Sequence, residues 1–174
     1  QSYPESLLLA SKGDWVNFDI LVQENMSHPK LPPVGDRKQA RKLNEKALAK
    51  KMSDPSAIGM KEQANVLDPA DAEIADNLGL VLRVNSKVPE SEKQLLKVVT
   101  IWPNRASAWA NLGETLSILG KDELAIGAFV AAYRVSKKPD KVLEAYVRIA
   151  ANENENESTK INLVSAMRKI NKLK

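Results

Sequence analysis

The stretch that decides the fold is residues 105–139, RASAWANLGETLSILGKDELAIGAFVAAYRVSKKP. Its pair Leu112-Gly113 repeats the pair Leu78-Gly79 at a distance of 34 residues. Each pair lies within one helical pattern, and a second helical pattern follows it. A period of 34 residues is typical of helix-turn-helix units that bury their apolar faces only by stacking on one another. The sequence therefore predicts stacked helix pairs.

Apolar side chains recur every three or four residues on both sides of Gly120, as they do on one face of an α-helix. Gly120 is expected to end the first helix of this unit, and Asp122 is expected to cap the second. The two apolar stripes consist of Trp109, Leu112, Leu116 and Leu119, and of Ala125, Phe129, Ala132 and Tyr133.

These positions carry a resemblance to a known family. The string Trp-Ala-Asn-Leu-Gly at 109–113 and the residues after it resemble the tetratricopeptide repeat. The match covers 105–138 closely and 71–104 well, and it is weaker over 37–70. The resemblance implies an all-α fold, a right-handed α-solenoid of about five helix pairs that holds a protein partner. The consensus positions after the string are occupied by Leu116, Gly120, Ala125, Phe129 and Ala132.

Outside this stretch, the sequence predicts a capping helical pair at each end, a proline-rich linker and two further repeats. Residues 1–26 predict an N-terminal helical pair that caps the stack, and residues 27–36 predict a linker because their prolines exclude a helix. Three repeats then follow at 37–70, 71–104 and 105–138. Residues 139–174 predict a C-terminal capping pair, whose last helix is expected to be capped by Ser158 or Thr159. The expected total is ten helices and no strands.

Few residues are suited to catalysis. The chain has one histidine, His28, which lies in the predicted linker, and it has no cysteine. Activation of a serine nucleophile needs a rigidly held histidine, and a thiolate metal site needs cysteine. No window has the glycine spacing of a phosphate-binding loop. We therefore expect no enzyme activity, no metal site and no cofactor.

A partner is expected on the hollow side of the stack, which the first helix of each pair faces. The resemblance implies that Asn77 and Asn111 hold the backbone of an extended peptide; the alternative is that they make only local hydrogen bonds. The lysines of a clamp for a terminal carboxylate are absent, because Asp76 and Ala110 stand at the matching places. The predicted partner-binding residues are Asn77, Leu80, Arg83, Asn111, Glu114 and Arg148.

A basic cluster offers a second kind of binding. Residues 37–51 hold seven basic residues and one acid, Glu45, around an apolar stripe that includes Leu48. Such a helix suits an acidic protein, an anionic membrane surface or nucleic acid, or it is simply a solvated face. Nucleic acid is disfavoured because no aromatic residue interleaves the run. The predicted basic patch consists of Arg37, Lys38, Arg41, Lys42, Lys46 and Lys50.

The sequence thus predicts a non-catalytic scaffold that binds a protein or peptide segment, with an accessory role in bacterial secretion or pilus assembly as one setting. The alternatives are an electrostatic binder that uses 37–51 and a scaffold that assembles with copies of itself. No apolar run reaches the ~18 residues that span a bilayer. A cleaved signal before Gln1 would place the protein in the periplasm or outside the cell, and a trimmed start would leave it cytoplasmic.

Overall fold

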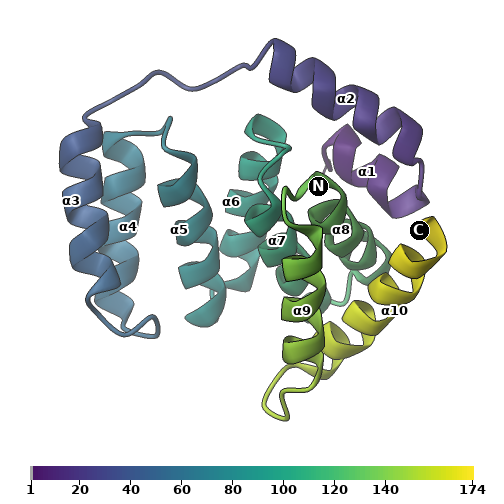
Figure 1. The fold of residues 1–174 in the computed structure, drawn as a ribbon. Helices are drawn as coiled ribbons and strands as arrows, with labels where there is room; N and C mark the ends of the chain where they lie inside the picture. Colours follow the sequence, from purple (N-terminus) through teal and green to yellow (C-terminus); the bar gives the residue numbers. More distant parts are fainter. Residues whose placement is uncertain (1) are drawn as a thin grey trace.

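The computed structural model describes residues 2–174; residue 1, on which the two alternatives for a cleaved signal depend, lies outside them. Residues 2–174 form ten α-helices and no strand, which confirms the all-α class and the expected number of helices (Figure 1). The helices are α1 (Glu5–Lys12), α2 (Trp15–Ser27), α3 (Arg37–Leu48), α4 (Pro55–Leu67), α5 (Ala72–Val84), α6 (Val88–Ile101), α7 (Ala106–Ile118), α8 (Asp122–Val135), α9 (Pro139–Ala150) and α10 (Glu157–Leu173).

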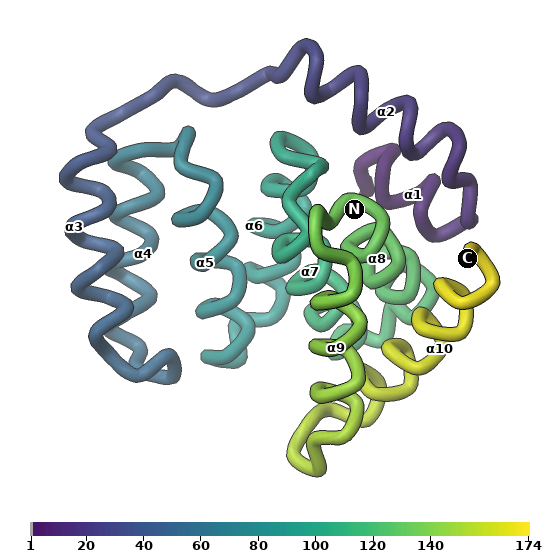
Figure 2. The backbone as a smooth tube through the Cα atoms, in the orientation of Figure 1, coloured from purple at the N-terminus to yellow at the C-terminus, as the bar shows by residue number. Residues whose placement is uncertain are grey.

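Helices α3 to α8 pack as three successive pairs. The members of each pair contact each other, and α4 contacts α5 while α6 contacts α7. Figure 2 shows the pairs following one another in chain order. The first helices of two neighbouring pairs, α5 and α7, also touch. Side chains on α5 and α7 can therefore form one continuous surface.

Two glycines, 34 residues apart, allow the helices within a pair to approach closely. A Cβ built on Gly79 would lie 2.5 Å from the side chain of Leu95, and one on Gly113 would lie 2.5 Å from the ring of Phe129. The repeated glycine is thus explained by packing, because the large residue of the second helix occupies the space that a side chain would need.

The N-terminal pair does not lie where the sequence led us to expect it. Helix α1 packs against α8 instead of ahead of α3, and the segment between α2 and α3 runs across the top of the molecule in Figure 1. Phe18 is buried at 5.7 Å from the ring of Trp109. A Cβ on Gly127 would come within 2.7 Å of the backbone of Ser11. The small residue on α8 and the apolar face of α1 and α2 together explain this position.

The C-terminal pair covers the other side of α8. Helix α10 packs on α7, α8 and α9. The buried amide of Asn162 donates to the hydroxyl of Ser117 at 3.0 Å and to the carboxylate of Asp122 at 3.0 Å. As a result, α8 is enclosed by α1, α7, α9 and α10.

Two predicted helix caps are wrong. Helix α8 begins at Asp122 itself, with Lys121 at the cap position, so Asp122 lies in the first turn. Helix α10 is capped by Asn156, whose side chain accepts the N–H of Thr159. In both places the helix begins earlier than expected, because an acidic residue is favourable throughout the first turn and asparagine is as good a cap as serine.

The apolar core is concentrated away from α3 and α4. One large cluster contains residues of α1, of α2 and of every helix from α5 through α10. The residues of α3 and α4 contribute only to two small clusters. Leu48, which was expected in the apolar stripe of its helix, is exposed. The α3–α4 pair is therefore the part of the stack with the least apolar burial, and polar contacts matter more there.

Those polar contacts tie the start of α3 to the end of α4. Gly35 N–H and Arg37 Nε donate to the carboxylate of Asp68 at 3.1 and 2.7 Å. Burial alone would raise the pKa of Asp68, but these hydrogen bonds outweigh it and hold the pKa below its usual value. A Cβ on residue 35 would lie 1.9 Å from the carbonyl oxygen of Leu67, so only glycine fits there.

Candidate functional site

A polar network joins α5 to α7 on the surface where the partner was expected. Its centre is Asp76, which is buried and accepts hydrogen bonds from Arg105 Nε at 2.8 Å, from the Ser107 hydroxyl, and from Asn111 Nδ2 at 3.0 Å. The carboxylate thus satisfies three donors from the neighbouring repeat. This arrangement fixes the spacing of the two helices and occupies one side of the Asn111 amide.

Arg83 and Glu114 extend this network. The Arg83 guanidinium lies 2.6 Å from the Glu114 carboxylate, and it also donates to Asn111 Oδ1 at 3.5 Å. Burial raises the pKa of Glu114, Arg83 opposes that change, and the charge of Glu155 adds to it. Both side chains are mostly buried. Solvent and salt therefore screen the attraction between their charges far less than they would in a surface ion pair.

Asn77 and Leu80 lie beside this network, toward α3 and α4. Both are half-buried and line a cavity of about 160 Å³ between α5 and the α3–α4 pair. The Asn77 side chain makes no hydrogen bond to any of residues 2–174, so its donor and acceptor remain open to a ligand. We name the surface formed by Asn77, Leu80, Arg83, Asn111 and Glu114 the α5–α7 face.

Arg148 is not part of the α5–α7 face. It is exposed on α9, and no carboxylate of residues 2–174 pairs with it. Within α9 the buried residue is Tyr146, whose hydroxyl donates to the Phe129 carbonyl at 2.6 Å. Burial, together with the charge of Glu114, raises the pKa of Tyr146 well above its usual value. Of the six predicted partner-binding residues, Arg83, Asn111 and Glu114 contact one another. Asn77 and Leu80 line one cavity toward α3 and α4.

The predicted basic patch is divided by its ion pairs. Arg37 and Arg41 are held by Asp68 at 2.7 Å and Asp71 at 2.9 Å. Lys50 lies 3.9 Å from Asp54 at the end of the loop that follows α3. The remaining members are Lys38, Lys42 and Lys46, which are exposed and spaced four residues apart.

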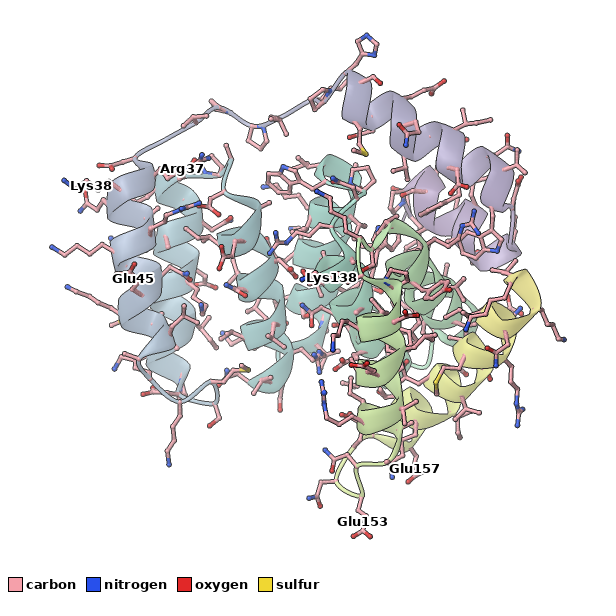
Figure 3. All side chains as sticks on the ribbon, viewed as in Figure 1. Arg37, Lys38, Glu45, Lys138, Glu153 and Glu157 are labelled. Carbon is pink, nitrogen blue, oxygen red and sulfur yellow. The ribbon has the colours of Figure 1, made fainter. Side chains whose placement is uncertain are left out.

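We name Lys38, Lys42 and Lys46 the lysine ridge. A spacing of four residues places the three side chains along one face of α3. Figure 3 shows Lys38 at the outer edge of the molecule, pointing away from the other helices. No carboxylate of residues 2–174 pairs with any of the three. The ridge is therefore a row of three lysines that form no ion pair within residues 2–174, with Glu45 as the one acid on the same helix.

The burial of the two charged residues next to the candidate site, Asp76 and Lys61, was not predicted from the sequence. Asp76 entered the sequence analysis only as the residue that stands in place of a clamp lysine. The signal for Asp76 was available, because Arg105 and Asn111 lie one repeat further along the chain, at distances of 29 and 35 residues. The signal for Lys61 was its spacing: it lies four residues after Ala57 and three before Ala64, so it shares the buried face of its helix with these alanines.

Other candidate chemistry is not assembled in the described part of the chain. His28 is exposed beyond the end of α2. Among residues 2–174, no three His, Cys, Asp or Glu side chains gather as a metal site would require. None of the helices formed by these residues has both the length and the apolar character to cross a membrane.

Comparisons with known proteins leave the resemblance as a prediction. No protein-family model matches the sequence. A search of curated proteins likewise finds no significant match.

Proposed function

We propose that the chain is a right-handed α-solenoid of the tetratricopeptide type, which acts as a non-catalytic scaffold and holds an extended protein segment on its α5–α7 face. The observation that carries this proposal is the open amide of Asn77, which lies beside Leu80 in the wall of the cavity between α5 and the α3–α4 pair. An extended segment needs hydrogen-bond partners for its backbone, and an asparagine side chain both donates and accepts.

The solenoid part of the proposal is supported by the packing of α3 to α8. Successive pairs contact one another, and equivalent glycines make equivalent close approaches in two repeats. The N-terminal pair adds a feature of its own, since it lies on α8 and thickens the stack at that end.

The polar network gives the α5–α7 face its rigidity. Asp76, Arg83, Asn111 and Glu114 bond mainly to one another, so they hold the face in shape while Asn77 and Leu80 meet the partner. A preorganised surface loses less conformational entropy on binding. In this arrangement Asn111 is a positioning residue, and a role in an assembly such as bacterial secretion or pilus formation is an analogy from the repeat family.

Peptide selection tests this function. Peptides chosen from a random library by the wild-type chain are expected to shift the amide NMR signals of Asn77 and Leu80 most strongly. Asn77→Ala combined with Leu80→Ala should weaken binding of these peptides by at least about tenfold, because these two side chains are the ones proposed to contact the partner directly. Circular dichroism should stay unchanged.

Matched controls separate this face from the general surface. Asn171→Ala and Val66→Ala remove an exposed amide and an exposed apolar side chain elsewhere, and they should leave affinity unaltered. Peptides that bind the double variant as tightly as the wild type would contradict the proposed function.

The lysine ridge supports a second candidate function, electrostatic binding of an anionic surface. Three exposed lysines without partners on one helix face make a strong local positive potential. An acidic protein segment or an anionic membrane surface fits this charge. Nucleic acid fits it less well, since no aromatic side chain lies along the ridge for base stacking.

Binding to vesicles that contain an anionic phospholipid, and to poly-glutamate, tests the ridge. We expect affinity to fall steeply between ~50 and ~200 mM salt. Changing Lys38, Lys42 and Lys46 to glutamine should abolish binding to both the vesicles and poly-glutamate. The same change at the exposed Lys93, Lys97 and Lys172 alters net charge equally and should preserve most of the binding. Equal losses in the two triple variants would show that net charge alone is responsible.

A further inference from the structure

Within residues 2–174, one buried charge lacks a countercharge. Five charged side chains are buried among residues 2–174, and four of them are carboxylates that each contact a basic side chain. The fifth is Lys61 on α4, which is 2% exposed. The four pairs are Asp68 with Arg37, Asp71 with Arg41, Asp76 with Arg105, and Glu92 with Lys121, at 2.7 to 2.9 Å.

Lys61 is only partly satisfied by its neighbours. Its Nζ donates to the Oδ1 of the buried Asn44 at 2.8 Å, which accounts for one of the three ammonium protons. No carboxylate of residues 2–174 lies within 4.0 Å of it. Burial lowers the pKa of Lys61, and the more distant charge of Glu73 offsets this only in part. A buried cation in such surroundings is costly unless an anion joins it.

Lys61 forms part of the wall of the cavity beside the α5–α7 face. The other lining residues come from α3, the turn after it, α4 and α5, and they are mostly apolar, with Leu80 and Met52 among them. The volume of about 160 Å³ is far above the ~10–15 Å³ that one water molecule needs. The cavity is therefore large enough for a carboxylate and the methylene groups that carry it.

We propose that this cavity receives an acidic side chain, Asp or Glu, of the bound segment, and that its carboxylate supplies the countercharge of Lys61. Asn77 lines the same cavity and is free to bond the backbone beside that acidic residue. A carboxylate matches the two remaining ammonium protons, and charge-assisted hydrogen bonds of this kind are short and strong. A phosphate would bring a second negative charge. The other basic side chain in the cavity wall is Lys50, and its ammonium already lies near the carboxylate of Asp54.

This inference deepens the peptide-binding function proposed above and rests on it. It also makes the partner's chemistry specific: a segment with an acidic residue next to the position that contacts Leu80. Lys61 lies on α4, the second helix of its pair, and is thus separate from positions 76 and 110, where the resembled family's clamp for a terminal carboxylate would require lysine.

The first experiment uses propionate as a probe and needs no partner. Sodium propionate is titrated into the wild-type chain against sodium chloride at the same ionic strength, and the lysine side-chain Cε signals are followed by NMR. The Lys61 signal, identified by its loss in Lys61→Met, and the amides of Asn77 and Leu80 should shift and saturate. The exposed Lys46 should not respond. Signals that stay unmoved, or that move alike at all lysines, would overturn the inference without touching the proposed function.

The second experiment uses the selected peptides and separates the sources of the carboxylate. In wild type, changing the acidic residue of the peptide to its amide should weaken binding by at least about tenfold, whereas in Lys61→Met the same change should have no effect. Amidating the peptide C-terminus should make no difference. A loss caused by C-terminal amidation instead, or tight binding of peptides without any acidic residue, would overturn the inference while leaving the α5–α7 face as the binding site.

Discussion

Replacement of Trp109 by alanine is expected to lower the free energy of unfolding by about 4 kcal/mol. The indole is fully buried where α7, α8 and the N-terminal pair meet, and its Nε1 donates to the Pro103 carbonyl at 2.7 Å. Its ring packs edge-on against Phe18. Removing it leaves a large cavity and an unsatisfied carbonyl at the same time. Thermal unfolding followed by circular dichroism should show a midpoint lower by roughly 10 °C.

Trp102 provides a matched control for this change. It is the same residue type, but it is only half-buried at the end of α6. Trp102→Ala should therefore cost less than half as much stability, since less apolar surface returns to water. Equal losses in the two variants would contradict the central position of Trp109 in the core.

Replacement of Gly127 by leucine is expected to release the N-terminal pair from α8. A Cβ at this position meets the backbone of Ser11 at 2.7 Å, and a backbone cannot move aside as the end of a side chain can. We expect the free energy of unfolding to fall by about 3 kcal/mol, which is in the upper range for overpacking. Hydrogen exchange should show that α1 and α2 lose protection, whereas α5 and α6 keep theirs.

Gly59 is the control glycine. It lies within α4, and a Cβ built on it meets nothing within 4 Å. Gly59→Ala should be neutral or should stabilise the chain by up to about 1 kcal/mol, because alanine favours the helix. If Gly127→Leu left the exchange of α1 unchanged, the close approach of α1 and α8 would be refuted.

The helices of the N-terminal pair could be predicted from the sequence, but their position on α8 could not. The helical patterns of α1 and α2 and the proline-rich break after them were readable, because these signals act over a few residues. Their packing partner was not, since Phe18 and Trp109 are 91 residues apart and the shapes of both surfaces decide their contact. Gly127 looks like any other small residue of a helix until the neighbouring backbone is known.

The binding surface divides in a similar way. The repeat pattern predicts Asn77, Leu80, Arg83, Asn111 and Glu114 on one side of the first helices. In the structure, Arg83, Asn111 and Glu114 contact one another, whereas Asn77 and Leu80 line the cavity toward α3 and α4. The structure also separates their roles: Arg83, Asn111 and Glu114 bond to each other or to Asp76, and Asn77 remains open. These roles depend on the distances between helices, and such distances cannot be inferred from the spacing of residues along one helix.

By itself, the sequence determined the ten helices, the absence of strands from residues 2–174, and the recurrence of the Leu-Gly pair in α5 and α7. These follow from helical periodicity, from proline and glycine at the breaks, and from a repeat of 34 residues. Only the tertiary structure decided that the N-terminal pair lies on α8, that Asp76 joins two repeats, and that Lys61 is buried without a countercharge. Local preferences act within a turn or two of a helix, whereas burial and charge pairing depend on which distant surfaces fit together.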